Sequence, residues 1–244
     1  MKRLLAALLF TAICSISVFA QTESRADVLR EIEAKRAELA KLETAYIAIP
    51  ADERSAFAEF LSQPNTGLIR LMPREKFDSY SNQKSGLTLR GGGSYYSFSR
   101  REQDYGFATE LGLEQGYLKV GFAGADYGML LKLGNVRLED VSTELPAVSF
   151  LAKYAAVSNE PDARVEQHRF AYGTVVEGVS YKDRLKAEVG ATYLLRSINF
   201  DEADVLVAFT IVRQDQDGSL IIPWRLLQTY SVPKLARNTA QAQD

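Results

Sequence analysis

The chain has 244 residues, with 29 basic and 31 acidic side chains and a formal net charge of −2 at pH 7. A weakly acidic chain without a Lys/Arg cluster argues against nucleic acid as the partner, because phosphate binding requires concentrated positive charge. One Cys and one His are too few for the usual zinc sites, and the sequence predicts neither a metal nor a cofactor.

The first twenty residues have the pattern of a bacterial secretory signal peptide. Lys2 and Arg3 precede an apolar stretch, and the small residues Val18 and Ala20 favour cleavage after Ala20. Cleavage would remove two cations and the only Cys, so the mature net charge is −4 and burial alone must stabilise the fold. We expect a periplasmic or secreted protein with no membrane span after cleavage.

Residues 21–63 are predicted to be a helical segment that contains one long and one short helix. Apolar residues recur at 4-3 heptad spacing before Pro50, which should end the long helix. The residues of this seam are Val28, Ile32, Leu39, Leu42, Tyr46 and Ile49, with Lys35 as its polar member. Two interpretations stay open: an amphipathic helix that lies on its own domain, or a short coiled coil that joins copies of the chain or binds a protein partner.

Residues 64–233 are predicted to form an antiparallel β domain, a sandwich or a rolled sheet, which makes the fold class α+β and mainly antiparallel β. Strands are expected in YGFATELGL, GYLKVGF, DYGMLLKL, KAEVGATYLLRSI, ADVLVAFTIVR and SLIIPWRLLQTYSV. ADVLVAFTIVR is apolar on both faces, which is typical of a strand in the middle of layers. Pro223 should place the last strand at an edge or a bulge.

The remaining parts of this segment have weaker patterns. A helix is expected over residues 146–157 and a strand pair over Arg169–Tyr181. The polar tail, residues 234–244, should fray.

The stretch Asp215-Gln216-Asp217-Gly218 raises the question of a calcium loop. With Gly218 at the sixth position of an EF-hand loop, Arg213 and Trp224 would occupy ligand positions one and twelve, where oxygen ligands are needed. A hairpin needs only a turn with positive φ between two apolar strands. The sequence therefore favours a hairpin.

Other potential chemistry is weak, and we predict no catalytic residue. His168, the only histidine, is expected to be a surface or capping residue. Ser-x-x-Lys occurs at Ser81/Lys84 and Ser231/Lys234 without the companion elements of serine acyl-transferases. The glycines at 91–93 lack the ending of a phosphate loop.

Three residues are candidates for a ligand or partner surface. Alternation favours core positions for most of the aromatic residues between 95 and 127, whereas Tyr95 and Tyr117 could point outward and stack on sugars or a partner. Asp126 lies in GFAGADYG, which is either a turn or a place where a ligand approaches the backbone closely.

The leading hypothesis is an exported, non-enzymatic binding or scaffolding protein of the bacterial cell envelope, with the long helix as its association element. One alternative is a small outer-membrane β-barrel, although ADVLVAFTIVR does not alternate as a barrel strand should. The other is a periplasmic hydrolase that uses a pair of carboxylates.

Overall fold

A computed structural model describes residues 24–76, 91–103 and 105–236. The signal-peptide pattern, Ser81/Lys84 and residues 237–244 of the predicted tail lie outside the described residues. The chain divides into two units, Met1–Lys41 and Leu42–Asp244, and each is described here by itself.

The long helix α1 spans Arg25–Ile47. Its first turn is capped by the Ser24 hydroxyl, which accepts a hydrogen bond from the Asp27 backbone N–H at 3.2 Å. The helix ends three residues before Pro50, as expected because a proline disfavours the helical conformation of the residue that precedes it. The predicted short helix is split into α2, Ala51–Ala56, and α3, Ala58–Leu61.

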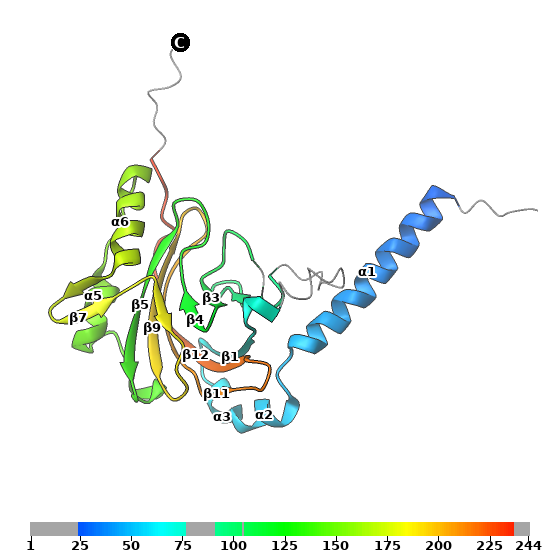
Figure 1. Ribbon diagram of the computed structural model, residues 1–244, viewed down its shortest axis with the longest axis horizontal. Helices are drawn as coiled ribbons and strands as arrows, with labels where there is room; N and C mark the ends of the chain where they lie inside the picture. Colours follow the sequence, from blue (N-terminus) through cyan, green and yellow to red (C-terminus); the bar gives the residue numbers. More distant parts are fainter. Residues whose placement is uncertain (1–23, 77–90, 104, 237–244) are drawn as a thin grey trace, which may run out of the picture. The chain divides into compact units, whose positions relative to one another are not determined.

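The centre of the second unit is a six-stranded antiparallel sheet (Figure 1). Its strands are β1 Thr66–Leu71, β5 Tyr127–Gly134, β9 Thr192–Asn199, β10 Ala203–Thr210, β11 Arg213–Gln214 and β12 Leu220–Thr229. The order is β1-β12-β10-β9-β5, with β11 paired to β12. The fold class is thus α+β and mainly antiparallel, as predicted.

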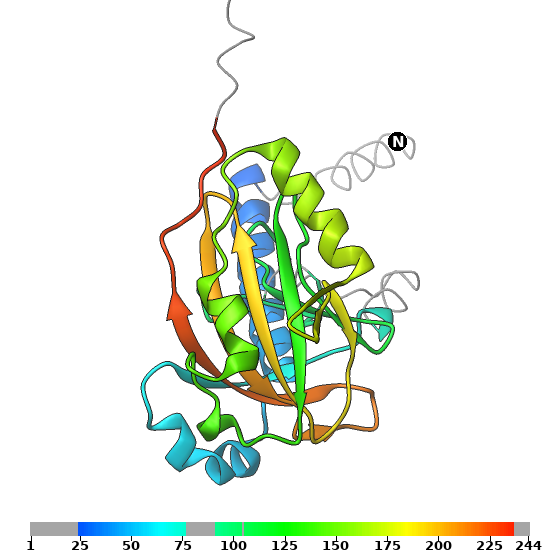
Figure 2. The ribbon, with the colours of Figure 1, turned by 90° about the vertical axis from the view of Figure 1, so that its left-hand side faces the viewer.

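Further layers cover both faces of this sheet. The antiparallel strands β2 Tyr95–Tyr96, β3 Leu111–Glu114, β4 Tyr117–Lys119 and β8 Arg184–Lys186 form a second sheet. On the opposite face lie the 3-10 helix η1 Leu138–Asp140, the helices α5 Pro146–Lys153 and α6 Glu160–Tyr172, and the hairpin β6 Thr174–Val176 with β7 Val179–Tyr181 (Figure 2).

Strands β9 and β10 have no solvent-facing side. Tyr193, Leu195, Val205 and Val207 join a core cluster with residues of the second sheet. Their neighbours along the strands belong to a second cluster with residues of α5 and α6. The prediction that ADVLVAFTIVR lies in the middle of layers is confirmed, because alternate side chains of β10 are buried in the two clusters on opposite faces of the sheet.

Pro223 does not lie at a sheet edge, because β12 has neighbours on both sides. It pairs with Leu68 of β1. On its other side it falls between Ile221, paired with β11, and Trp224, paired with β10. The proline therefore sits opposite the break between β10 and β11, where no ladder hydrogen bond needs its missing N–H.

Two other local predictions are wrong. The strand expected from Tyr105 begins only at Leu111, because a turn precedes it in which the Thr109 hydroxyl accepts from the Gly106 N–H at 2.8 Å. The first residues of the strand pair expected over Arg169–Tyr181 are instead the end of α6. Gly173, with φ of 92°, stops that helix and the hairpin follows.

A charged pair is buried on the helix-covered face of the central sheet. Arg196 of β9 and Asp204 of β10 are 1% and 3% exposed, and their two hydrogen bonds measure 2.5 and 2.9 Å. The Arg196 Nη1 also donates to the Leu151 carbonyl at 2.8 Å, near the C-terminus of α5. The guanidinium thus satisfies a helix-end carbonyl that would otherwise be buried without a partner.

We expect Asp204→Ala to lower the free energy of unfolding by about 3–5 kcal/mol, because it leaves a guanidinium buried without its counter-charge. Urea unfolding of the mature chain measures this loss. Arg137→Ala is the control, since Arg137 forms exposed pairs with Glu139 and Asp140 and should change stability little. If the two variants lose the same free energy of unfolding, the buried pair contributes no more to stability than an exposed pair does.

Candidate functional site

The predicted seam on α1 is largely exposed. Five of its six apolar residues are between 38% exposed, for Leu39, and 64% exposed, for Leu42. Ile49 follows the end of the helix and is half-buried. Lys35 interrupts the seam and lies 3.6 Å from Glu31 on the same helix. Each of these five apolar side chains at heptad spacing is more than a third exposed.

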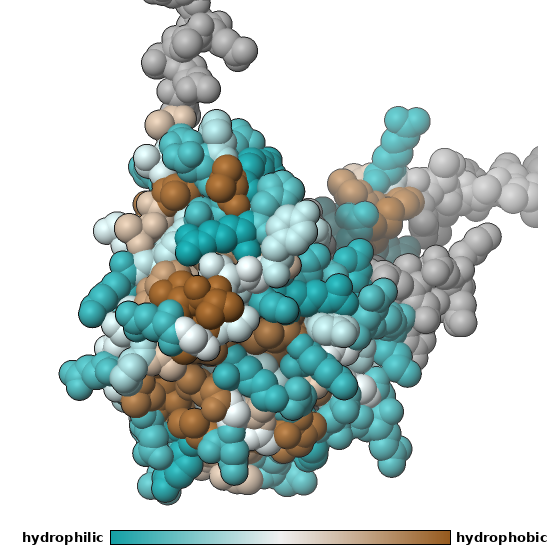
Figure 3. Space-filling view, turned by 60° about the vertical axis from the view of Figure 1, so that its left-hand side comes forward, coloured by the Kyte–Doolittle hydropathy of each residue, from teal (hydrophilic) through white to brown (hydrophobic). Residues whose placement is uncertain are grey.

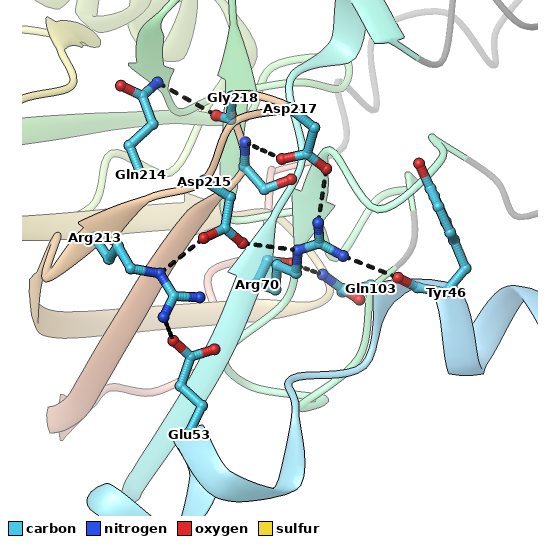
Figure 4. A network of polar contacts seen from close by, with 10 residues as sticks. Tyr46, Glu53, Arg70, Gln103, Arg213, Gln214, Asp215, Asp217 and Gly218 are labelled. Carbon is cyan, nitrogen blue, oxygen red and sulfur yellow. Dashed lines mark hydrogen bonds and ion pairs between the residues drawn. The ribbon is translucent and has the colours of Figure 1, made fainter.

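Arg70 of β1 joins three segments in a polar network (Figure 4). Its Nη2 donates to Asp217 at 2.6 Å, and its Nη1 donates to the Tyr46 carbonyl in the last turn of α1 at 3.0 Å. Its Nε lies 3.5 Å from the Asp215 carboxylate. One guanidinium thus faces both carboxylates that the sequence placed in a candidate calcium loop.

The hairpin prediction for these residues is confirmed. Residues 215–219 turn between β11 and β12, with Gly218 at φ of 87°. Asp215 also accepts from Arg213 at 2.7 Å, and Arg213 in turn pairs with Glu53. Burial raises the pKa of Asp217, but the Ser219 N–H and the Arg70 charge outweigh it and the pKa is lowered. In the described ranges, no group of three or more His, Cys, Asp or Glu side chains is suited to hold a metal ion.

A concave surface next to this network, here called the arginine pocket, has a volume of about 470 Å³. Arg54, Arg70 and Arg101 line it, and none of the other described lining residues is charged. Its walls are Ile47, Ile49, Leu68, Ile69 and Tyr96. Ile49, predicted as the last residue of the seam, thus lies in this pocket.

Asp126 lines a smaller cavity of about 220 Å³ together with Asp183 and His168. Asp126 is 6% exposed, and its Oδ1 accepts from the Phe200 N–H at 2.8 Å. Burial raises the pKa of Asp126 to about 7, and burial also raises the pKa of Asp183. This cavity, the Asp126 pocket, brings together two carboxyl groups and the only histidine.

The glycines around Asp126 lie close to other parts of the chain, without a ligand being needed to explain them. A Cβ on Gly128 would lie 2.6 Å from the Arg196 carbonyl oxygen of β9. A Cβ on Gly121, whose φ is 76°, would lie 3.2 Å from the Asp126 carbonyl oxygen and from the Tyr127 Cα. His168 is exposed on α6, so its expected surface position is correct.

The two candidate tyrosines have different environments. Tyr95 is 3% exposed, so its predicted outward position is wrong: its hydroxyl donates to Glu114 at 2.6 Å, and its ring packs edge-on against Phe122 at 5.3 Å. Tyr117 is 38% exposed, and the Arg184 guanidinium lies 4.0 Å from its ring centre. Tyr117 is therefore the one of the pair that a ligand can reach.

Glu110 is a buried acid that no sequence pattern singled out. Glu110 is fully buried and accepts from the backbone N–H groups of Phe98 and Ser99 at 2.5 and 3.1 Å. Burial raises its pKa to about 7. Glu110 directly precedes β3, and Phe98 and Ser99, which donate to its carboxylate, lie twelve and eleven positions earlier in the chain, so no pattern around Glu110 indicates its burial.

Apolar patches lie among hydrophilic residues on the face that carries α5, α6 and the β6–β7 hairpin (Figure 3). A cavity of about 360 Å³ there is lined by aromatic residues that include Phe150, Tyr154 and Tyr181. The charged residues in its described lining, Lys153 and Glu177, have opposite signs. This cavity therefore shows no preference for a charged ligand.

Comparisons with protein-family models, curated proteins and solved structures found no match for the chain. Among the helices of the described ranges, none is both long enough and apolar enough to cross a membrane. The function must therefore be argued from the surfaces and pockets described above.

We expect Asp126→Asn to change how stability depends on pH. An Asp whose folded pKa is about 7 keeps a proton that the unfolded chain releases near pH 4, so this group lowers the free energy of unfolding as pH rises between about 4 and 7. Urea unfolding should show the variant gaining about 4 kcal/mol over wild type between those limits, because about 1.4 kcal/mol is lost from the wild type for each of about three pH units. A difference independent of pH would contradict the raised pKa.

Millimolar calcium should leave the melting temperature of the wild-type chain unchanged, because Arg70 and Arg213 already neutralise the two turn carboxylates. Differential scanning calorimetry with calcium and with chelator makes the comparison. A calcium-dependent rise that Asp217→Asn abolishes would establish a metal site in this turn.

Proposed function

We propose that this chain is an exported, non-enzymatic binding or scaffolding protein of the bacterial cell envelope that self-associates through α1. The observation that carries the proposal is the exposed seam from Val28 to Tyr46. The basic and apolar pattern ahead of Ala20 supports export.

Self-association gives this seam a physical role. A helix of 23 residues is about 34 Å long, and one side of it presents an apolar row, while its other sides carry mainly charged residues and alanine, with Leu29 as an exposed apolar exception. Pairing two such rows removes apolar surface from water. Each Å² of apolar surface buried in this way stabilises the pair by about 25 cal/mol. Lys35 in the row reduces stability and restricts register, as a polar core residue does in coiled coils.

A carboxylate hydrolase is the second candidate, favoured by one observation. The Asp126 pocket holds two carboxyl groups whose pKa values are raised by burial, an arrangement that suits general acid catalysis. Its volume of about 220 Å³ is small for a substrate site. The pH profile of Asp126→Asn tests the titration that this alternative requires.

We expect Leu39→Asp to dissociate the assembly. A carboxylate placed at a buried seam position has no partner there, so the dissociation constant should rise by at least about tenfold. Light scattering of the mature chain, residues 21–244, without detergent and over a range of concentrations measures the mass.

Two further variants make the test specific. Ala37→Asp places the same charge on the opposite side of α1 and should leave the mass unchanged. Lys35→Leu completes the apolar row and should shift the assembly to lower concentrations. A wild-type chain that is monomeric at every concentration, or equal dissociation by both aspartate variants, would refute self-association through the seam.

A further inference from the structure

We propose that the arginine pocket binds a ligand that carries a phosphate or carboxylate group on an apolar body. The pocket adjoins the C-terminal end of α1, but its arginines lie outside the seam, and the proposal holds whether or not the chain self-associates.

Among the described residues, only one of the three arginines of the pocket is paired with carboxylates. Arg70 is neutralised by Asp215 and Asp217. Within the part of the chain that the structure describes, Arg54 and Arg101 form no ion pair with a carboxylate. The neighbouring Arg100, outside the pocket, does form such pairs, with Glu102 and Glu202. Two uncompensated guanidinium groups in one concavity of a net acidic chain favour an anion.

Arg101 is held in place before any ligand arrives. Its φ of 57° lies in the left-handed region, which is uncommon for a residue with a long side chain. Its guanidinium lies 5.5 Å from the ring centre of Trp224, which is 1% exposed and therefore fixed. Backbone strain retained at a surface residue is typical of binding sites, because other contacts must hold it.

The rest of the pocket defines the other part of the ligand. The side chains of Ile47, Ile49 and Leu68 form an apolar wall beside the arginines. The Gln103 amide donates to the Arg70 carbonyl at 2.5 Å and ties the loop that carries Arg101 to β1. A volume of about 470 Å³ falls within the range of small-molecule sites. An anion with an apolar body would use both parts of this surface.

The test is isothermal titration of the mature chain with octyl phosphate below its micelle concentration. Inorganic phosphate and octyl glucoside are titrated in parallel, because the first lacks the apolar body and the second lacks the charge. Arg54→Gln and Arg101→Gln are the pocket variants. Arg100→Gln is the matched control, since it removes the adjacent cation outside the pocket. Melting temperatures verify that the variants are folded.

We expect saturable binding of octyl phosphate that each pocket variant weakens by about tenfold and that Arg100→Gln leaves unchanged. Inorganic phosphate and octyl glucoside should each bind at least about tenfold more weakly than octyl phosphate. Equal binding of octyl glucoside, equal losses in all three variants, or no saturable binding would overturn the proposal. If inorganic phosphate binds as tightly as octyl phosphate, the proposal that the ligand has an apolar body is wrong.

Discussion

Strands β9 and β10 cannot be exposed to water on either face, and most of the second unit follows from that constraint. Each strand carries apolar side chains in both directions, so a single sheet would leave half of them in water. The second sheet covers one face, and α5, α6 and a hairpin cover the other. The one charged pair on these strands, Arg196 with Asp204, also contacts the end of α5 and so fixes how the helical layer sits.

The edge of the central sheet near β1 is organised by charge instead of by apolar burial. Arg70 receives the carboxylates of the β11–β12 turn on one side and contacts the last turn of α1 on another. The same side chain forms part of the arginine pocket. Neutralising Arg70 within the protein leaves Arg54 and Arg101 as the cations with which a ligand can pair.

The elements that could be predicted correctly from the sequence are those whose pattern lies within one continuous segment. The two-sided apolar strand β10, the hairpin turn at Gly218 and the end of α1 before Pro50 are such cases. It failed where a partner far along the chain decides the outcome: Tyr95 is buried by Phe122 and hydrogen-bonded to Glu114, neither of which its own strand reveals. Arg70 and Asp217 are 147 positions apart, so no local spacing indicates their contact.

Helix α6 was missed for a different reason. It buries only Ala163 and Phe170, so its helical periodicity is too weak to see among polar residues. Its start was nevertheless marked, because the Asn159 side chain caps the Asp162 N–H at 2.9 Å and a proline stands in the first turn. Capping residues identify such a helix better than its apolar pattern does.

The two proposed surfaces meet at the end of α1, and this limits the strength of any assembly. Ile49, the seventh position of the predicted seam, lines the arginine pocket, so the row left for pairing runs from Val28 to Tyr46 and is shorter than three heptads. A row of that length, interrupted by Lys35, supports at most a reversible contact. In the proposed assembly, such a contact would therefore form mainly where the local concentration of the protein is high.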